Sequence, residues 1–107
     1  MPVRGTTISA PFLGVYDRTL ASCSGPSQDR TTITPNELRF HETIGKVRSV
    51  LPRGDNELEV DADYQGEGEY WHSNRLLTLS QGGARLIIDR DGNSPAMMRV
   101  RCPAGTG

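Results

Sequence analysis

The residues with the clearest chemical potential are carboxylates that occupy alternate positions between residues 57 and 69. Two carboxylates at positions i and i+2 of a strand stand about 7 Å apart, within the spacing range of a glycosidase acid–base pair. Such a pair needs a cleft that raises the pKa of one member, and these positions form a single exposed strand face. We therefore expect either a docking face for a cationic partner or a solvated face paired with neighbouring arginines. The carboxylates are Glu57, Glu59, Asp61, Asp63, Glu67 and Glu69.

The histidines and serines add no recognisable catalytic or metal-binding pattern. His41 precedes Glu42, but adjacent residues of a strand face opposite sides, so we expect these two not to cooperate. His72 follows Trp71, and no third ligand accompanies either histidine as a zinc site requires. No serine lies in the G-x-S-x-G turn of a hydrolase nucleophile. The sequence thus predicts a protein that is not an enzyme and that uses no metal or other cofactor.

The glycine-rich stretch at residues 64–72, YQGEGEYWH, has three possible interpretations. A phosphate loop places its glycines between a strand and a helix, whereas no helical pattern follows here, and the interleaved glutamates would repel phosphate. A metal site would need converging His or Cys side chains. We therefore expect one long strand over residues 57–70, in which Gly66 and Gly68 face inward and allow a bend.

The rest of the chain alternates polar and apolar residues between turn formers, and no ten-residue segment has helical periodicity. This pattern predicts an all-β fold of about eight antiparallel strands in a small meander barrel, with a two-sheet β-sandwich as the alternative. Short connections, including a compact hairpin at residues 80–85, link the strands. The expected parts are a flexible N-terminal segment (1–10), one barrel domain (11–103) and a disordered tail (104–107).

The composition of the chain limits how large its hydrophobic core can be and which kinds of partner it can bind. With 107 residues, of which 35% are hydrophobic, the single domain has a thin core. A disulfide between Cys23 and Cys102 would staple it and would indicate an oxidising compartment; the alternative is two free thiols in the cytosol. A net charge of −1 argues against nucleic acid, and no apolar run is long enough to span a membrane. No signal peptide is visible. Because the expected disulfide indicates an oxidising compartment, we expect a periplasmic or secreted protein whose signal is absent from this sequence.

Six aromatic residues leave a second function open. Core packing accounts for them, but they would also suit a barrel mouth that holds a small apolar ligand, as in a carrier of the lipocalin type. The aromatic residues are Phe12, Tyr16, Phe40, Tyr64, Tyr70 and Trp71.

Three segments carry a resemblance to a known group. At GEGEYW (66–71), LRFHETIGKV (38–47) and RVRCP (99–103), the chain resembles small exported proteins of unassigned function from GC-rich proteobacteria, with one Cys near each end. The resemblance spans about residues 11–103 and implies no activity. The expected architecture is also similar to that of periplasmic inhibitors of c-type lysozyme, which insert a short loop into the enzyme; SQGGARL (80–86) loosely resembles that loop.

These observations together predict a binding protein without catalysis. Its expected partner is another protein of the bacterial envelope, bound in the manner of an inhibitor through the acidic strand face or the hairpin at residues 80–85. The alternative is a carrier for a small apolar ligand. The expected binding residues are Glu59, Asp61, Asp63, Glu67, Glu69, Trp71, Ser80 and Arg85.

Overall fold

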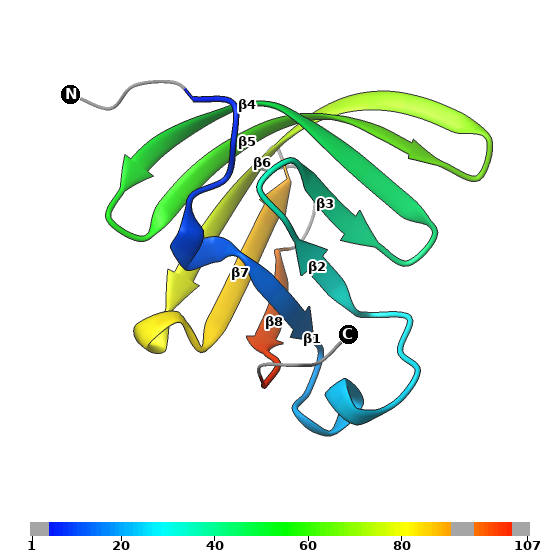
Figure 1. The fold of residues 1–107 in the computed structure, drawn as a ribbon, viewed down its shortest axis with the longest axis vertical. Coiled ribbons are helices and arrows are strands. Elements are labelled where there is room, and N and C mark those ends of the chain that lie inside the picture. The colour runs from blue at the N-terminus through cyan, green and yellow to red at the C-terminus, as the bar shows by residue number, and fades with distance from the viewer. Residues whose placement is uncertain (1–4, 91–95, 104–107) are drawn as a thin grey trace.

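The computed structural model describes residues 5–90 and 96–103, and within them eight strands close into one antiparallel barrel (Figure 1). Each strand pairs with the next along the chain, and the last pairs with the first, so the predicted meander barrel is confirmed and the sandwich alternative is not. Three single-turn 3-10 helices, η1 (Ala10–Phe12), η2 (Ala21–Ser24) and η3 (Gln81–Gly83), lie in the connections. The strands are β1 (Gly14–Asp17), β2 (Thr31–Ile33), β3 (Glu37–Phe40), β4 (Thr43–Gly54), β5 (Glu57–Gly66), β6 (Glu69–Ser80), β7 (Arg85–Arg90) and β8 (Met97–Arg101).

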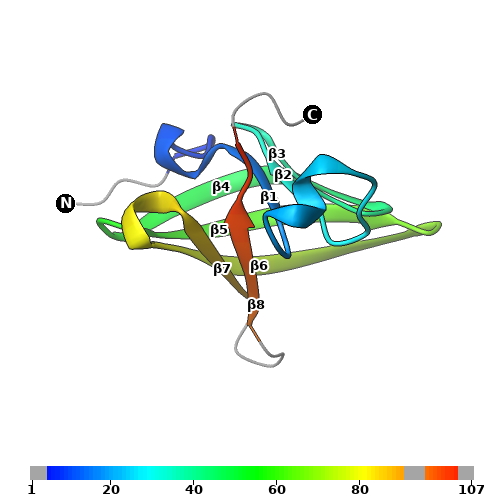
Figure 2. The same cartoon turned by 90° about the horizontal axis from the view of Figure 1, so that it is seen from below.

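The strands differ greatly in length. β4, β5 and β6 contain 12, 10 and 12 residues, whereas none of the other strands exceeds six. Figure 2 shows these three strands as a long twisted ribbon along one side of the molecule, with the β5–β6 turn projecting beyond the short strands. β3 pairs with the first four residues of β4 and β7 pairs with the last six of β6, so the short strands join the two edges of the ribbon at opposite ends.

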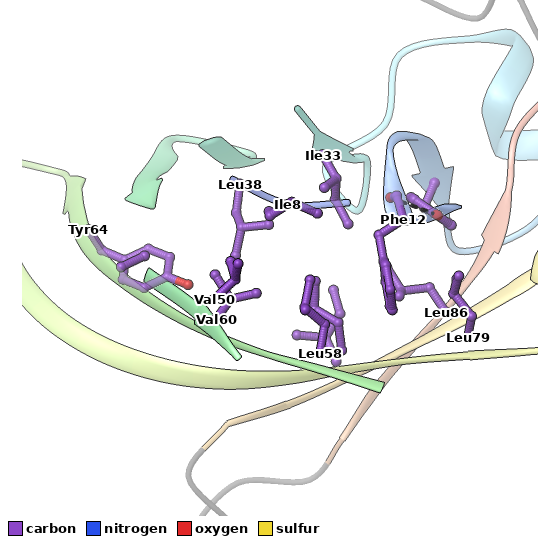
Figure 3. Packing of buried hydrophobic residues seen from close by; sticks show 14 residues of the cluster. Ile8, Phe12, Ile33, Leu38, Val50, Leu58, Val60, Tyr64, Leu79 and Leu86 are labelled. Atoms are coloured by element: carbon purple, nitrogen blue, oxygen red, sulfur yellow. Dashed lines mark hydrogen bonds between the residues drawn. The ribbon is translucent and has the colours of Figure 1, made fainter. Parts of the chain in front are cut away.

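The alternation in β5 places one face of this strand in the core, as predicted. Leu58, Val60, Ala62 and Tyr64 are all almost fully buried. They belong to a cluster of 14 buried apolar residues that point into the barrel from all sides (Figure 3). Burying a side chain such as that of Val60 contributes about 1.5–3 kcal/mol relative to leaving it exposed.

The prediction of a single strand over residues 57–70 is wrong. β5 ends at Gly66, and Glu67 and Gly68 form a two-residue turn with φ angles of 50° and 79°. Positive φ at both central residues is what a type I′ hairpin turn requires, and glycine adopts it without strain. Gly68 therefore lies in an exposed turn rather than on the inner face. The alternation of polar and other residues in the sequence continues through the two turn residues, so the sequence pattern alone does not reveal the turn.

The turn also reverses which residues face inward. Gly66 pairs with Glu69, and directly paired residues of an antiparallel ladder share a face. As a result, Trp71 lies on the inner face beside Tyr64, and Tyr70 lies on the outer face. The acidic face predicted over residues 57–69 thus stops at Asp63: Glu67 occupies the turn and Glu69 lies on the opposite face.

The N-terminal segment packs against the barrel where it is described. Gly5 forms a bridge with Val50 on β4, and the Ile8 N–H donates to the carbonyl of Pro35 at 2.9 Å. Ile8 is buried in the core. The segment thus covers the edge of β4 beyond the residues that pair with β3. The flexibility expected for residues 1–10 stays a prediction. Residues 1–4 and the tail at 104–107 lie outside the described residues.

The predicted disulfide joins η2 to the end of β8. Cys23 and Cys102 are bonded, with their Cα atoms 5.7 Å apart. Asp17 on β1 is buried nearby and accepts hydrogen bonds from Ser27 and from Arg30. Burial alone would raise the pKa of Asp17, but these hydrogen bonds and the charge of Arg30 lower it below its usual value.

Candidate functional site

The outer face of β5 carries three of the predicted binding residues, and all three already have partners within the chain. Arg53 donates to Glu59 at 2.6 Å, and Asn74 donates to the same carboxylate at 2.8 Å. Asp63 accepts from Arg48 at 3.3 Å, and Asp61 contacts His72. These contacts match the alternative interpretation of the acidic positions, a solvated face with cationic neighbours.

His72 lies between two carboxylates of the neighbouring strand. Its Nδ1 is 2.9 Å from an oxygen of Asp63, and its Nε2 contacts Asp61. The hydrogen bond to Asp63, together with the negative charges of both carboxylates, raises the pKa of His72 above its ordinary value. The same hydrogen bond and the charge of Arg48 lower the pKa of Asp63. This group lies on an exposed strand face, so it neutralises charge and offers no enclosed site for a substrate.

The hairpin tip, which we define as residues 63–74, has a different character. Ile44 on β4, Gln65 on β5 and Tyr70 on β6 lie side by side on the outer face. The side chain of Tyr70 is 77% exposed and that of Ile44 is 41% exposed. Glu67 and Glu69 form no ion pair with any residue that the structure describes. An exposed aromatic and an exposed aliphatic side chain thus lie on the outer face of the hairpin end that also carries Glu67 in the turn and Glu69 on the inner face.

A groove of about 660 Å³ crosses this end of the ribbon, between the β3–β4 turn and the β5–β6 turn. Ile44 and Tyr70 both line it. Its wall contains four carboxylates and one lysine. Three of these carboxylates have partners within the chain: Glu37 with Arg39, Glu42 with His41, and Asp63 with Arg48 and His72. A groove lined by exposed apolar side chains and by a carboxylate without such a partner favours a ligand that is both cationic and partly apolar. The four carboxylates and the cation are Glu37, Glu42, Asp63, Glu67 and Lys46.

The β3–β4 turn departs from the expected strand. His41 and Glu42 form this turn, Glu42 has a φ of 61°, and the two side chains approach to 3.7 Å. The prediction that they face opposite sides of a strand is therefore wrong, because the alternation rule does not apply within a turn.

Beneath the tip, the inner face holds an aromatic cluster that supports it. The rings of Tyr64 and Trp71 stack with centroids 5.8 Å apart, and Phe40 lies 6.4 Å from Tyr64. The guanidinium of Arg75 lies 4.8 Å from the centroids of both Phe40 and Tyr64. Trp71, predicted as a binding residue, is therefore held in place by stacking and is partly exposed at the rim of this cluster.

Gly45 makes room for this cluster. A Cβ at Gly45 would overlap the ring of Tyr64, which occupies the neighbouring inner position on β5. Gly66 has a similar role, since a Cβ there would lie 2.6 Å from the backbone oxygen of Glu42. The sequence interpretation assigned the role of making space to Gly66 and Gly68; the structure assigns it to Gly45 and Gly66.

The remaining predicted binding residues lie at the other end of β6. Ser80 of β6 pairs with Arg85 of β7 across the hairpin. The side chain of Arg101 holds the loop between them by donating a hydrogen bond to the carbonyl of Gly83 at 2.8 Å. Since a strand advances about 3.3 Å per residue, Ser80 lies roughly 35 Å along β6 from Glu69, the first residue of that strand. The predicted residues therefore do not form one surface: Glu67, Glu69 and Trp71 lie at one end of β6, and Ser80 and Arg85 at the other.

Sequence reasoning missed Tyr70, Ile44 and Arg75. Arg75 is only 7% exposed, and its Nε has no hydrogen-bond partner among the described residues. Its inward position follows from the alternation of Leu77 and Leu79, which points Arg75 to the same side. Tyr70 was assigned to the wrong face because its position depends on where the turn lies.

Among the described residues, one cluster has potential metal-ligand geometry: Asp17, Cys23 and Cys102. The two sulfur atoms are bonded to each other, so they are not available as thiolate ligands.

Comparison of the chain with protein-family models, with curated proteins and with solved structures finds no match. In the part of the chain that the structure describes, no helix combines the length and apolar character needed to cross a bilayer.

Proposed function

We propose that this protein binds a cationic surface of another protein through the hairpin tip. The observation that carries the proposal is the exposure of Tyr70 and Ile44 on either side of Gln65, in a groove that has four carboxylates and one lysine. Aromatic anchors within a polar rim are characteristic of protein interfaces, in which a few such residues supply most of the affinity. Isolated exposed apolar residues need no explanation, but a paired set inside a groove does.

The charge distribution supports a cationic partner. Between Arg53 and Arg75 the chain contains seven Asp and Glu residues and no Lys or Arg. The overall net charge of −1 hides this local field. On the outer face of β5, Glu59, Asp61 and Asp63 are paired with arginines or with His72, whereas Glu67 and Glu69 at the tip form no ion pair with any described residue. These two glutamates therefore offer charge to a partner.

Two further observations favour external binding without catalysis. In the titratable cluster of His72, Asp61 and Asp63, only Asp63 lines the groove, and His72 and Asp61 lie on the strand face outside it. The barrel interior contains 14 buried apolar side chains, which leaves the carrier alternative with less support (Figure 3). The disulfide fits a periplasmic or secreted location, where we place the partner, and binding there would be of the inhibitor type.

Site-specific photo-crosslinking tests the proposal. A photoreactive residue replaces Tyr70 at the tip or, as a matched control, Leu20, which is 64% exposed beside η2. In extract of the producing cells we expect the Tyr70 probe to capture a specific protein with a basic surface. We also expect the Glu67→Lys and Glu69→Lys changes to abolish that capture. Equal capture from both positions, or capture that survives the charge reversals, contradicts the proposal.

A further inference from the structure

Along the hairpin tip, β6 has an edge that no strand of the described residues covers. Residues 75–80 of β6 pair with β5 on one side and with β7 on the other. Residues 69–74 pair with β5 alone, and no described strand lies along their other side. Figure 2 shows the same arrangement, with the tip extending past the end of β7. Since every second residue of a strand points its N–H and C=O to a given side, about three donors and three acceptors face outward there.

This edge has few of the features that normally protect an open strand. Proteins block such edges with proline, with lysine or with a bulge that twists the strand away. Residues 69–74 contain no proline and no lysine, and the β5–β6 register runs without a shift from Glu57 to Gly66. The register shifts of the ribbon lie instead between β4 and β5. The edge is thus regular and able to accept another strand.

The side chains along the edge specify what kind of strand would fit. On the inner face, Glu69 and Trp71 are two positions apart and therefore side by side. A strand added to β6 would place alternate side chains next to them. A basic residue beside Glu69 gains an ion pair, and an apolar or guanidinium group beside Trp71 gains ring contact.

We propose that the open edge of β6 binds an extended, basic segment of the partner by β-strand addition. This inference rests on the proposed function and specifies how the tip recognises its partner. A second copy of this chain is a poorer occupant, because each copy would bring its own acidic hairpin, with seven carboxylates and no Lys or Arg between Arg53 and Arg75. Main-chain hydrogen bonds supply the affinity in this mode, and alternate side chains supply the specificity.

Capped hexapeptides of alternating Arg and Val provide a defined probe. Two isomers carry N-methyl groups either on the Arg residues or on the Val residues, so each loses the hydrogen-bond donors of one edge only. We expect calorimetry to show that one isomer binds at least tenfold more weakly than the parent peptide while the other binds almost normally. We also expect the parent peptide to slow amide exchange at alternate positions within residues 69–74. A peptide of alternating Glu and Val should not bind.

The outcomes separate the binding mode from the proposed function. If both methylated isomers bind like the parent while Tyr70→Ser weakens all three, strand addition is wrong and the tip remains a binding surface. If neither the basic peptide nor the Tyr70 photo-crosslink captures anything, both proposals fail. If amide protection of residues 69–74 appears without peptide and rises with protein concentration, the occupant is a second copy and the proposed partner is wrong.

Discussion

The two halves of the β5–β6 hairpin differ in how many neighbours they have. In the barrel half, β6 lies between β5 and β7, and Leu58 and Leu77 are fully covered. In the hairpin tip, β6 has β5 alone beside it among the described strands, and Tyr70 is largely exposed. Both halves are regular antiparallel ladders with alternating side chains, so their local structure is the same.

In the barrel half, β7 covers the edge of β6 and the core covers its inner face. In the tip, no described strand covers that edge, Tyr70 is exposed, and Glu67 and Glu69 form no ion pair with any described residue. We propose that the barrel half serves stability and that the tip serves recognition. We therefore expect substitutions in the barrel half to change the free energy of unfolding, and substitutions in the tip to change binding.

The largest expected effect comes from the disulfide, which lies far from the tip. Removing it with the Cys23→Ala and Cys102→Ala changes releases a cross-link between residues 79 positions apart. Loop-closure entropy predicts a loss of about 4–5 kcal/mol in the free energy of unfolding. Urea denaturation measures this loss. Superimposable curves for the native and doubly substituted proteins would show that the barrel is held by packing alone.

The second prediction compares equivalent residues of the two halves directly. Leu77→Ala empties a fully buried site and should cost about 2–5 kcal/mol. Tyr70→Ala removes a larger side chain from an exposed site and should cost less than about 0.5 kcal/mol. Thermal denaturation of both variants checks the difference. A loss for Tyr70→Ala as large as that for Leu77→Ala would mean that the tip is part of the folded core.

The third prediction concerns the space beneath the tip. Gly45→Val places a side chain where the ring of Tyr64 lies, and overpacking of this kind costs about 1–3 kcal/mol. Gly25→Ala is the matched control, because no heavy atom lies within 4 Å of a Cβ at Gly25. Near-UV circular dichroism should also change for Gly45→Val, since Tyr64 stacks on Trp71. An unchanged spectrum and melting temperature would contradict the packing of this cluster.

The smallest expected effect is the pH dependence of the paired face on β5. Because the pKa of His72 is raised in the folded protein, its contribution is complete below the unfolded value of about 6.5 and is lost as pH rises through the folded value. Because the pKa of Asp63 is lowered, its contribution is lost as pH falls through that lower value. The stabilisation should therefore be greatest in mildly acidic solution.

Melting temperatures of the native protein and of His72→Gln measure this dependence. We expect the native protein to have a small advantage at about pH 5 and none at about pH 9. Since the side chains of His72 and Asp63 are about half exposed, the difference should shrink in high salt. A constant difference across this range would show that His72 contributes through packing and not through charge.

Much of the barrel follows from local patterns in the sequence. Alternation from Leu58 to Tyr64 predicts the buried face of β5, because side chains of a strand point alternately to its two sides whatever surrounds it. The pairing of Cys23 with Cys102 follows from there being two cysteines, near the two ends of the core. Short turns between such runs predict the antiparallel meander.

The structure of the hairpin tip depends on contacts between strands, which no local sequence pattern encodes. The alternation passes through Glu67 and Gly68 almost unchanged, so only the pairing of Gly66 with Glu69 places the turn there and directs Tyr70 outward. The need for glycine at position 45 arises from a ring on another strand. Alternation within a strand is a property of its own backbone, whereas free edges and available space depend on where neighbouring strands end. The sequence by itself thus determined the eight-stranded barrel and its disulfide, and only the tertiary structure decided at which end of the β5–β6 hairpin β6 has no second strand beside it among the described residues.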